Sequence, residues 1–520
     1  MDYYGCSRTK RRRIKAKAAE HLQMLEDLHA KNQVSSNLEC VTELNSQIPS
    51  EQWDTQTQAC WSESGQESDS GMFFSDSSEE LNLDGSAERT NPFNDLKRKL
   101  AYWAPNHNIS QSALSELLHI LVQSELDLPR DPRTLLSTLT TCDVNDIGDG
   151  SYYHFRVSNA IISLLSHESD PSTDTLTLCV NIDGLPLFRS SKMELWPILA
   201  KIEELPRSNV IIIGLYAGPT KPNSVEDYLY DFIKDLKVVT NEGLHYNGKH
   251  YNIALPDAFI CDAPARAFLK CTKGHSGYNS CERCTEHGIR MDNKVVFPDL
   301  KAPVRTDEQF TDMIDEEHHH GVSPLQELGI GMVSSFVLDC MHLVCLGNVR
   351  KLVSLWIKGP LRCRISATTM SIISNHLKSI RKHLPSNFSR KPRFLMEYGQ
   401  WKATEFRQFL LYMGPAVLQG RLPTRLYNNF MLLSVAMRIL LSPALCSEYC
   451  DYADKLLKCY VTNFVKIYGS EHVVYNTHNL IHLADDERKF GALDSVSCFP
   501  FENYLGTLKR LVRRPQNPLQ

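Results

Sequence analysis

Three acidic residues stand at places in the sequence where carboxylates could do chemistry together. Asp183 follows "TLTLCVNI", in which apolar and polar residues alternate as in a strand, and it precedes the turn-forming Gly184. Asp262 ends the apolar run "AFIC", which is typical of a buried strand, and Pro264 suits the first turn of a following helix. Glu502 lies in "CFPFENYLGTLKRLV", which has helical spacing.

Side chains at strand ends and on a covering helix can converge in a mixed sheet flanked by helices. Three such carboxylates suit in-line phosphodiester cleavage, in which two Mg²⁺ ions about 3.5–4 Å apart stabilise the attacking and leaving oxygens. Hard cations such as Mg²⁺ or Mn²⁺ take oxygen ligands. Spacing alone leaves a simpler interpretation open, with Asp183 as a turn residue and Glu502 as a first-turn acid that favours the helix dipole.

A second group lies in "CTKGHSGYNSCERC", which contains Cys271, His275, Cys281 and Cys284. Thiolates and an imidazole in a knuckle-like loop of this size can close a tetrahedral structural Zn²⁺ site, with Zn–S distances of about 2.3 Å. A Cys-x-x-Cys pair can instead be redox active, but the nearby histidine favours a metal. His287 is a spare fourth ligand, and the histidine run at 318–320 is a third source.

The elements that must position these residues change along the chain. Residues 1–92 are an expected disordered tail, with the basic cluster "RTKRRRIKAK" and an acidic Ser-rich segment, neither of which can bury a core. The basic cluster is either a solvated helix start or a nuclear-import or phosphate-binding segment. Helical spacing at 93–145 predicts a small helical module.

Strand and helix patterns mix from 172 to 270, as in "NVIIIGLY" and "SVEDYLYDFIKDL", which predicts the first part of an α/β core. Residues 271–482 hold the cysteine-rich loop and then, from about 330, an almost wholly helical pattern. Residues 483–520 complete the core with the helix that carries Glu502. The stretch "NTHNLIHL" adds His478 and His482, four residues apart, which pack equally well in a core, and we assign them no role.

Composition limits the function classes. The 520 residues exceed what one core usually fills, and 56 basic against 61 acidic residues give a formal net charge of -5. Any nucleic-acid affinity must therefore come from local clustering. The 16 scattered cysteines and the lack of an apolar segment behind the basic N-terminus favour a reducing compartment. The most apolar long run, at 426–445, contains Arg438, which argues against a membrane partner.

Five segments occur in one order: "NIDGLPLFRSSKMELWPIL", "YAGPTKPNSVEDYL", "ICDAPARAFLKCTKGHSGYNSCERC", "LDCMHLVCLG" and "FPFENYLGTLKRLVR". Together they resemble the transposase domain of CACTA-type (En/Spm-like) elements and their animal relatives, over about residues 175–516. Such transposases are similar to the wider DDE superfamily. The resemblance implies an RNase H-like mixed-sheet core that carries metal-binding acids, interrupted by a long all-helical insertion.

The resemblance also implies roles for particular residues. Asp183 would be the first acid, Asp262 the second after the fourth strand, and Glu502 the third, on the helix after the insertion. In "LDCMHLV", Asp339 and His342 resemble the D-x-x-H element found downstream of the second acid in related transposases. Their spacing puts both on one helical face, where a structural packing pair is the other interpretation.

Basic residues follow the last acid. Lys509, Arg510, Arg513 and Arg514 would face DNA phosphates if this helix lies along DNA, whereas a solvated surface is the alternative. The resemblance implies DNA as the partner, either transposon ends or genomic DNA, together with a nuclear location. Homo-oligomerisation stays open.

Three functions fit the sequence. The first is a transposase that cleaves and joins DNA strands with Mg²⁺ or Mn²⁺. The second is a domesticated, catalytically inactive nuclear DNA-binding or scaffold protein, favoured because no DNA-binding zinc finger or helix-turn-helix signature precedes the core. The chain also stops soon after the last motif, whereas such transposases commonly continue. The third is a zinc-stabilised protein-interaction module, which would bind Zn²⁺ but no DNA.

Overall fold

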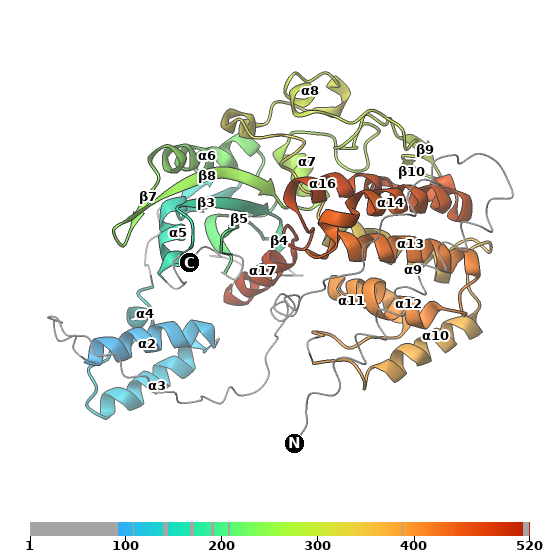
Figure 1. Cartoon of the computed structure of the whole chain (residues 1–520). Coiled ribbons are helices and arrows are strands. Elements are labelled where there is room, and N and C mark those ends of the chain that lie inside the picture. Colours follow the sequence, from blue (N-terminus) through green and yellow to red (C-terminus); the bar gives the residue numbers. More distant parts are fainter. Residues whose placement is uncertain are drawn as a thin grey trace. The chain divides into compact units, whose positions relative to one another are not determined.

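The computed structural model describes residues 92–107, 109–138, 144–166, 171–188, 192–205, 209–386, 388–512 and 519. The expected disordered tail, with its basic and acidic segments, lies outside these residues. The described part is a mixed α/β protein with a large curled sheet and many helices (Figure 1). Its strands are β1 (Asn145–Ile147), β2 (Gly150–His154), β3 (Thr175–Ile182), β4 (Leu185–Pro186), β5 (Glu194–Ile202), β6 (Ile211–Gly218), β7 (Leu244–Tyr246), β8 (Lys249–Phe259), β9 (Ile289–Met291) and β10 (Lys294–Val296).

Helices account for most of the remaining described residues. The α-helices are α2 (Pro92–Asn106), α3 (Gln111–Gln123), α4 (Pro132–Leu135), α5 (Val157–Leu165), α6 (Val225–Glu242), α7 (Ala263–Leu269), α8 (Asp307–Thr311), α9 (Arg350–Lys358), α10 (Ala367–Ile380), α11 (Ala403–Gln408), α12 (Gly414–Leu418), α13 (Thr424–Leu440), α14 (Cys446–Tyr468), α15 (Tyr475–His478), α16 (Leu483–Phe490) and α17 (Phe499–Leu511). Short 3₁₀ segments are η1 (Glu316–His318), η2 (Pro324–Leu328), η4 (Leu395–Gln400), η6 (Ser470–His472) and η7 (Asn479–His482), and η3 (Met341–Val349) and η5 (Phe409–Met413) are π-helical.

The main sheet has the strand order β1-β2-β6-β5-β3-β8-β7, and β4 pairs with β5 beside this path. All neighbours are antiparallel except β3 and β8, which run parallel. A parallel pair needs a crossover connection, and the chain makes it between β6 and β7 through α6. Strand β3 therefore lies between an antiparallel neighbour, β5, and a parallel one, β8.

The two faces of β3 are buried against different cores. Leu178 and Val180 pack into a core that includes α5 and α6, whereas Cys179 between them joins the core of the later helices. The sequence alternation in 175–182 predicts one apolar face and one more polar face. In the structure both faces of β3 are buried near its carboxyl end. Asn181 is buried there too, and its side-chain amide donates a hydrogen bond of 2.6 Å to the Ile260 carbonyl, which offsets the cost of burying a polar group.

Helix α6 shows why these segments are helical. Ser224 is its N-cap and accepts a hydrogen bond of 3.0 Å from the Asp227 N–H, and Gly243, at φ 69°, ends the helix. Its apolar side chains recur at helical spacing and face the sheet. Each fully buried Leu or Phe contributes about 1.5–3 kcal/mol. The buried residues are Tyr228, Leu229, Phe232, Ile233, Leu236 and Val239.

The later helices form a second core. From η3 to α16, no strand occurs among the described residues, and helices α9, α11, α13 and α14 lie together in Figure 1. Helices α13 and α14 pack along each other, and α14 also contacts α16. Separately, α2, α3 and α4 form a small module with its own apolar cluster around Leu114 and Leu118. None of the helices in the described part of the chain is apolar over enough residues to cross a membrane.

Close packing between β2 and β6 gives a test of the sheet. A Cβ added at Gly214 would lie 2.8 Å from Cζ of the buried Tyr152 ring and closer still to its hydroxyl. We expect Gly214→Ala to lower the free energy of unfolding by about 1–3 kcal/mol, because overpacking forces the ring to move. Gly506→Ala in α17 is the matched control, since nothing lies within 4 Å of its added Cβ. The control should be neutral or stabilising by up to about 1 kcal/mol in urea denaturation; equal effects would contradict the packing.

Candidate metal centres

The parallel pair β3 and β8 brings the first two acids to one edge of the sheet. Asp183 directly follows β3, and its Oδ1 accepts a hydrogen bond of 2.7 Å from the Gly184 N–H. Asp262 follows β8 by three residues and is the N-cap of α7, where Oδ1 accepts a bond of 2.8 Å from the Ala265 N–H. The carboxyl ends of neighbouring parallel strands share one edge, so both carboxylates lie there.

Short contacts place the start of α17 against the same edge. The thiol of Cys498, the residue before α17, donates to the Ile260 carbonyl at 3.5 Å, and the Asn181 amide donates to the same carbonyl. The Cys498 N–H donates to Oδ1 of the buried Asp339 at 2.9 Å. Because Glu502 stands in the first turn of α17, these bonds fix the position of Glu502 relative to the sheet edge.

Two of the acids, Asp183 and Glu502, have raised pKa values. Burial raises the pKa of Asp183 to about 7, and the charges of Asp262 and then Glu502 contribute, while the His342 charge opposes them. Burial also raises the pKa of Glu502, the His342 charge opposes that shift, and the charges of Asp339 and then Asp262 add to it. One ligand atom each from Asp183, His342 and Glu502 lies within 4.8 Å of the others. The structure therefore brings Asp183 and Glu502 together with His342, whereas Asp262 is not a member of this set and acts on the two acids through its charge.

His342 is the cation of this neighbourhood. Its Nδ1 lies 2.8 Å from Oδ2 of Asp339, and its Nε2 lies 3.7 Å from Oε1 of Glu502. Burial works against the charged imidazole, but the hydrogen bond and charge of Asp339, with the charges of Asp183 and Glu502, raise its pKa to about 9. Asp339 also holds α17 through Cys498. The pair thus orients Glu502 in addition to balancing its charge.

A second candidate centre is buried and contains sulfur and nitrogen. Cys281, Cys284, His478 and His482 each offer one ligand atom within 4.8 Å of the others. The two Sγ atoms are 3.5 Å apart, Cys284 Sγ is 3.2 Å from His478 Nε2, and Cys281 Sγ is 3.9 Å from His482 Nε2. Zn–S bonds of about 2.3 Å in a tetrahedron place two sulfurs about 3.8 Å apart. The group therefore fits a structural Zn²⁺.

Neighbouring groups orient these ligands. His478 Nδ1 lies 3.2 Å from the Phe297 carbonyl, so a proton on Nδ1 leaves Nε2 free to bind a metal. Burial opposes the Cys281 thiolate, but hydrogen bonds with Cys284, His478 and His482 hold its pKa well below the ordinary value. A thiolate is the form of cysteine that binds a metal.

The ligands come from two distant segments, not from one short loop. Cys271 and His275, which the sequence grouped with the two cysteines, are not members of the gathered set. Cys271 lies two residues after α7 in a left-handed conformation at φ 54°, and the His275 ring stands edge-on to Tyr475 with ring centroids 6.2 Å apart. The spare candidates are also elsewhere: His287 stacks on Tyr278, and His318 Nδ1 contacts the Asn279 carbonyl at 2.6 Å.

His478 and His482 take the places expected of Cys271 and His275. They lie on the α15–η7 turn, 194 and 201 residues after their cysteine neighbours. One signal could have found them, since two histidines spaced i and i+4 share a helical face, as in other zinc-binding helices. From the sequence alone, packing beside the neighbouring leucines explained these two histidines equally well.

A buried ion network joins this centre to the acidic edge. Glu282, between the two cysteines, accepts from Arg266 Nε at 2.9 Å, Lys270 Nζ at 3.2 Å and the Tyr475 hydroxyl. Despite burial, the charges of Arg266 and then Lys270 lower the Glu282 pKa to about 2. Arg266 also donates to the Cys261 carbonyl at 2.6 Å, next to Asp262. Breaking such a buried pair costs about 3–5 kcal/mol.

The basic residues after Glu502 are only partly described. Lys509, exposed on α17, donates from Nζ to the Pro186 carbonyl of β4, and Arg510 contacts the Thr507 hydroxyl at 3.1 Å. Arg513 and Arg514 lie outside the described residues. Lys509 and Arg510 therefore both lie on the last turn of α17, and Lys509 contacts β4.

Comparison with known proteins gives no relative to argue from. No family model matches this sequence, and a search of the curated proteins found no match either.

The cysteine and histidine centre predicts which substitutions release zinc. We expect the purified protein to hold about one Zn²⁺ per chain, and Cys284→Ser or His482→Ala to lose it, because three ligands leave the tetrahedral site open. Cys271→Ser and His275→Ala are matched controls and should retain the metal. Elemental analysis by mass spectrometry checks this. Loss of zinc from the controls, with retention in Cys284→Ser, would favour the loop ligands instead.

The raised pKa of Asp183 predicts a pH-dependent stability difference. In the unfolded chain this carboxyl ionises near 3.8, so between about pH 4 and pH 7 the folded protein keeps a proton that the unfolded chain has lost. Stability therefore falls as pH rises through this window. Without added divalent ions, Asp183→Asn should be more stable than the unsubstituted protein at about pH 8 by at least about 1.4 kcal/mol, one pKa unit.

The stabilisation should disappear at about pH 4, where folded and unfolded chains are both largely protonated at this site. Urea denaturation at the two pH values measures it. A stability difference that is the same at both pH values would mean that Asp183 carries no raised pKa.

Proposed function

We propose that this chain is a transposase-derived protein whose site is built for DDE-type cleavage and transfer of DNA strands. The observation that carries the proposal is that Asp183 and Glu502, 319 residues apart, offer ligand oxygens within 4.8 Å of each other, while the charge of Asp262 acts on both. Structural roles alone give no reason for this, because bringing three carboxylates together in a partly buried place is costly, and one imidazolium, His342, balances only part of their charge.

The sheet supports an RNase H-like core. Strands β3, β5 and β6 are successive antiparallel neighbours, and β8 adds in parallel on the other side of β3. This places one acid after the first long strand and one after the fourth, as the resemblance to CACTA-type transposases implies. The third acid follows a long helical region, also as implied. The strand order and the positions of the acids after the strands support this family in addition to the five sequence segments.

The chain's own residues define what the site does. Asp183 and Glu502, with Asp262 beside them, would hold Mg²⁺ or Mn²⁺ through carboxylate oxygens. Paired divalent ions, when bound, stabilise the attacking and leaving oxygens of a phosphodiester. Asp339 orients His342 and fixes the start of α17, so that Glu502 points at the sheet edge. His342 balances the negative charge of the acids.

The zinc-compatible centre has a structural role in this proposal. It would join the segment after α7 to the segment before α16, so that the helical region between them is tied back to the core. No substrate contact is required of it. The proposal also includes DNA as the partner and the nucleus as the location, and it leaves homo-oligomerisation open.

The second candidate is a domesticated nuclear DNA-binding or scaffold protein without chemistry. One observation favours it: His342, with a pKa raised to about 9, stands within 3.7 Å of Glu502, where a cation competes with metal ions for the same carboxylate. The acids would then serve as a charge-balanced structural cluster. The two candidates differ in whether the acids are needed for any reaction.

Cleavage of supercoiled plasmid DNA separates the two candidates. With Mg²⁺ or Mn²⁺ we expect nicking, and Asp183→Asn or Asp262→Asn should lower its rate by more than about 100-fold, because even residues that only support metal ligands are worth 10–100-fold. The matched control is Asp257→Asn, an acid on β8 whose side chain is 46% exposed and pairs with Lys489. Equal rates for all proteins, or no metal-dependent nicking, would exclude catalysis and favour the domesticated protein.

A further inference from the structure

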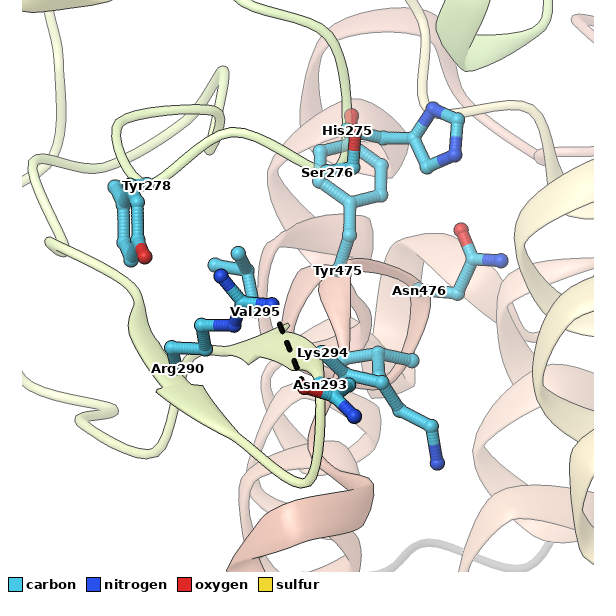
Figure 2. A pocket seen from close by; sticks show the side chains of 10 residues that line it. His275, Ser276, Tyr278, Arg290, Asn293, Lys294, Val295, Tyr475 and Asn476 are labelled. Atoms are coloured by element: carbon cyan, nitrogen blue, oxygen red, sulfur yellow. Dashed lines mark hydrogen bonds between the residues drawn. The ribbon is translucent and has the colours of Figure 1, made fainter.

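A pocket of about 460 Å³ opens beside the zinc-compatible centre, and none of the three acids Asp183, Asp262 and Glu502 lines it. Three walls form it: the loop at 275–278, the hairpin β9–β10 and the segment at 474–476 (Figure 2). This volume lies within the range of about 300–1,000 Å³ in which proteins bind small groups. Its residues are His275, Ser276, Tyr278, Arg290, Asn293, Lys294, Val295, Val474, Tyr475 and Asn476.

The lining is positive in a chain that is negative overall. Arg290 and Lys294 are exposed cations, and no carboxylate is among the lining residues. Arg290 contacts only the neutral Asn293 amide, at 3.4 Å, and no ion pair joins Arg290 or Lys294 to an acid in the described part of the chain. The acid of the hairpin, Asp292, is in the turn and outside the lining.

More positive charge stands behind the hairpin. Burial lowers the pKa of Lys351, and the nearby charge of Lys294 lowers it further. Burial and the charges of Lys351 and Lys294 also lower the pKa of His472, so this imidazole is mostly neutral near pH 7 and adds no positive charge. Glu471, the neighbouring acid, pairs with Arg362 and also lies 3.9 Å from Nε2 of His472. An anion in the pocket would reduce the repulsion between Lys294 and Lys351.

The walls are held rigidly enough to form a site. Residues Asp292 and Asn293 both have positive φ, which is the two-residue turn that tightens a hairpin. The Phe297 N–H donates to the Val473 carbonyl at 2.8 Å, and the Gly288 N–H donates to the Tyr278 carbonyl at 2.7 Å. Each of the other two walls also leads directly into zinc-compatible ligands, since Cys281 follows the loop and His478 follows the segment at 474–476.

We propose that this pocket binds a phosphate of the DNA backbone through Arg290 and Lys294, as a contact separate from the acidic site; this rests on the proposed function for the identity of DNA as the ligand. Asn293, Ser276 and Asn476 supply neutral polar groups beside the two cations. Tyr278, whose ring is 43% exposed, forms one flat wall. Backbone contacts of this kind position DNA without reading its sequence.

Salt-dependent DNA binding tests the pocket. The double variant Arg290→Gln, Lys294→Gln and the unsubstituted full chain are compared by fluorescence anisotropy on a short labelled DNA duplex, without added divalent ions. Each phosphate contact contributes about 0.9 to the slope of log affinity against log salt. We expect the double variant to bind several-fold more weakly at low salt and its slope to fall by about 1, the contribution of one phosphate contact.

Arg381→Gln, Lys382→Gln is the matched control, because it removes the same two charges from exposed positions after α10. Its slope should stay at that of the unsubstituted protein. Circular dichroism and zinc content of both variants should be unchanged, which excludes misfolding. An equal fall in slope for both pairs would reduce the effect to overall charge and overturn the pocket.

The remaining outcomes separate this inference from the proposed function. If the unsubstituted protein binds duplex DNA and the pocket variant has the same slope, the pocket is not a DNA contact, while plasmid nicking still decides the catalytic proposal. If the pocket variant loses binding of a labelled RNA or mononucleotide but not of duplex DNA, the ligand is another one and the inference is overturned. If the unsubstituted protein binds no DNA at any salt concentration, both proposals lose their ligand.

Discussion

Repulsion between carboxylates is the constraint on which the rest of this structure depends. Asp183 and Glu502 both have raised pKa values, and Asp262 contributes to each shift. Such a group stays together only if rigid surroundings oppose its separation. Here β3 and β8 fix two acids from one side, while Asp339 fixes α17 from the other. The long helical region is therefore part of the site, because it supplies both Asp339 and His342.

The buried polar contacts form a continuous path away from that edge. Arg266 joins the segment next to Asp262 to Glu282, and Glu282 lies between two cysteines of the zinc-compatible centre. Arg283 continues the path to Asp486 at 2.5 Å, and Asp486 accepts the Leu338 N–H at 2.7 Å, next to Asp339. Buried charges of this kind are stable only when all are paired. The path thus makes the loop after α7 a structural support for both ends of the acidic site.

Local patterns predicted part of this arrangement. The alternation before Asp183 and the apolar run before Asp262 predicted strand ends, and the structure places both residues just after β3 and β8. That these strands are adjacent and parallel is a long-range pairing, which no local pattern contains. For the same reason, the sequence predicted only two of the four zinc-compatible ligands. Cys281 and Cys284 are near each other in sequence, whereas His478 and His482 meet them only after the intervening helices fold.

The spacing of that centre has a consequence for how the protein could change over evolution. Cys284 and His478 lie 3.2 Å apart although 194 positions separate them in the chain. The polypeptide between them thus begins and ends at nearly one point, and its first part, including Phe310 and Phe336, packs in the core of the sheet. A segment whose two ends are adjacent tolerates changes in length and replacement, because the domain into which it is inserted need not change its structure. The helices within this polypeptide could be exchanged while the acids keep their places, provided that the part packed on the sheet stays and that an aspartate and a histidine again lie next to α17.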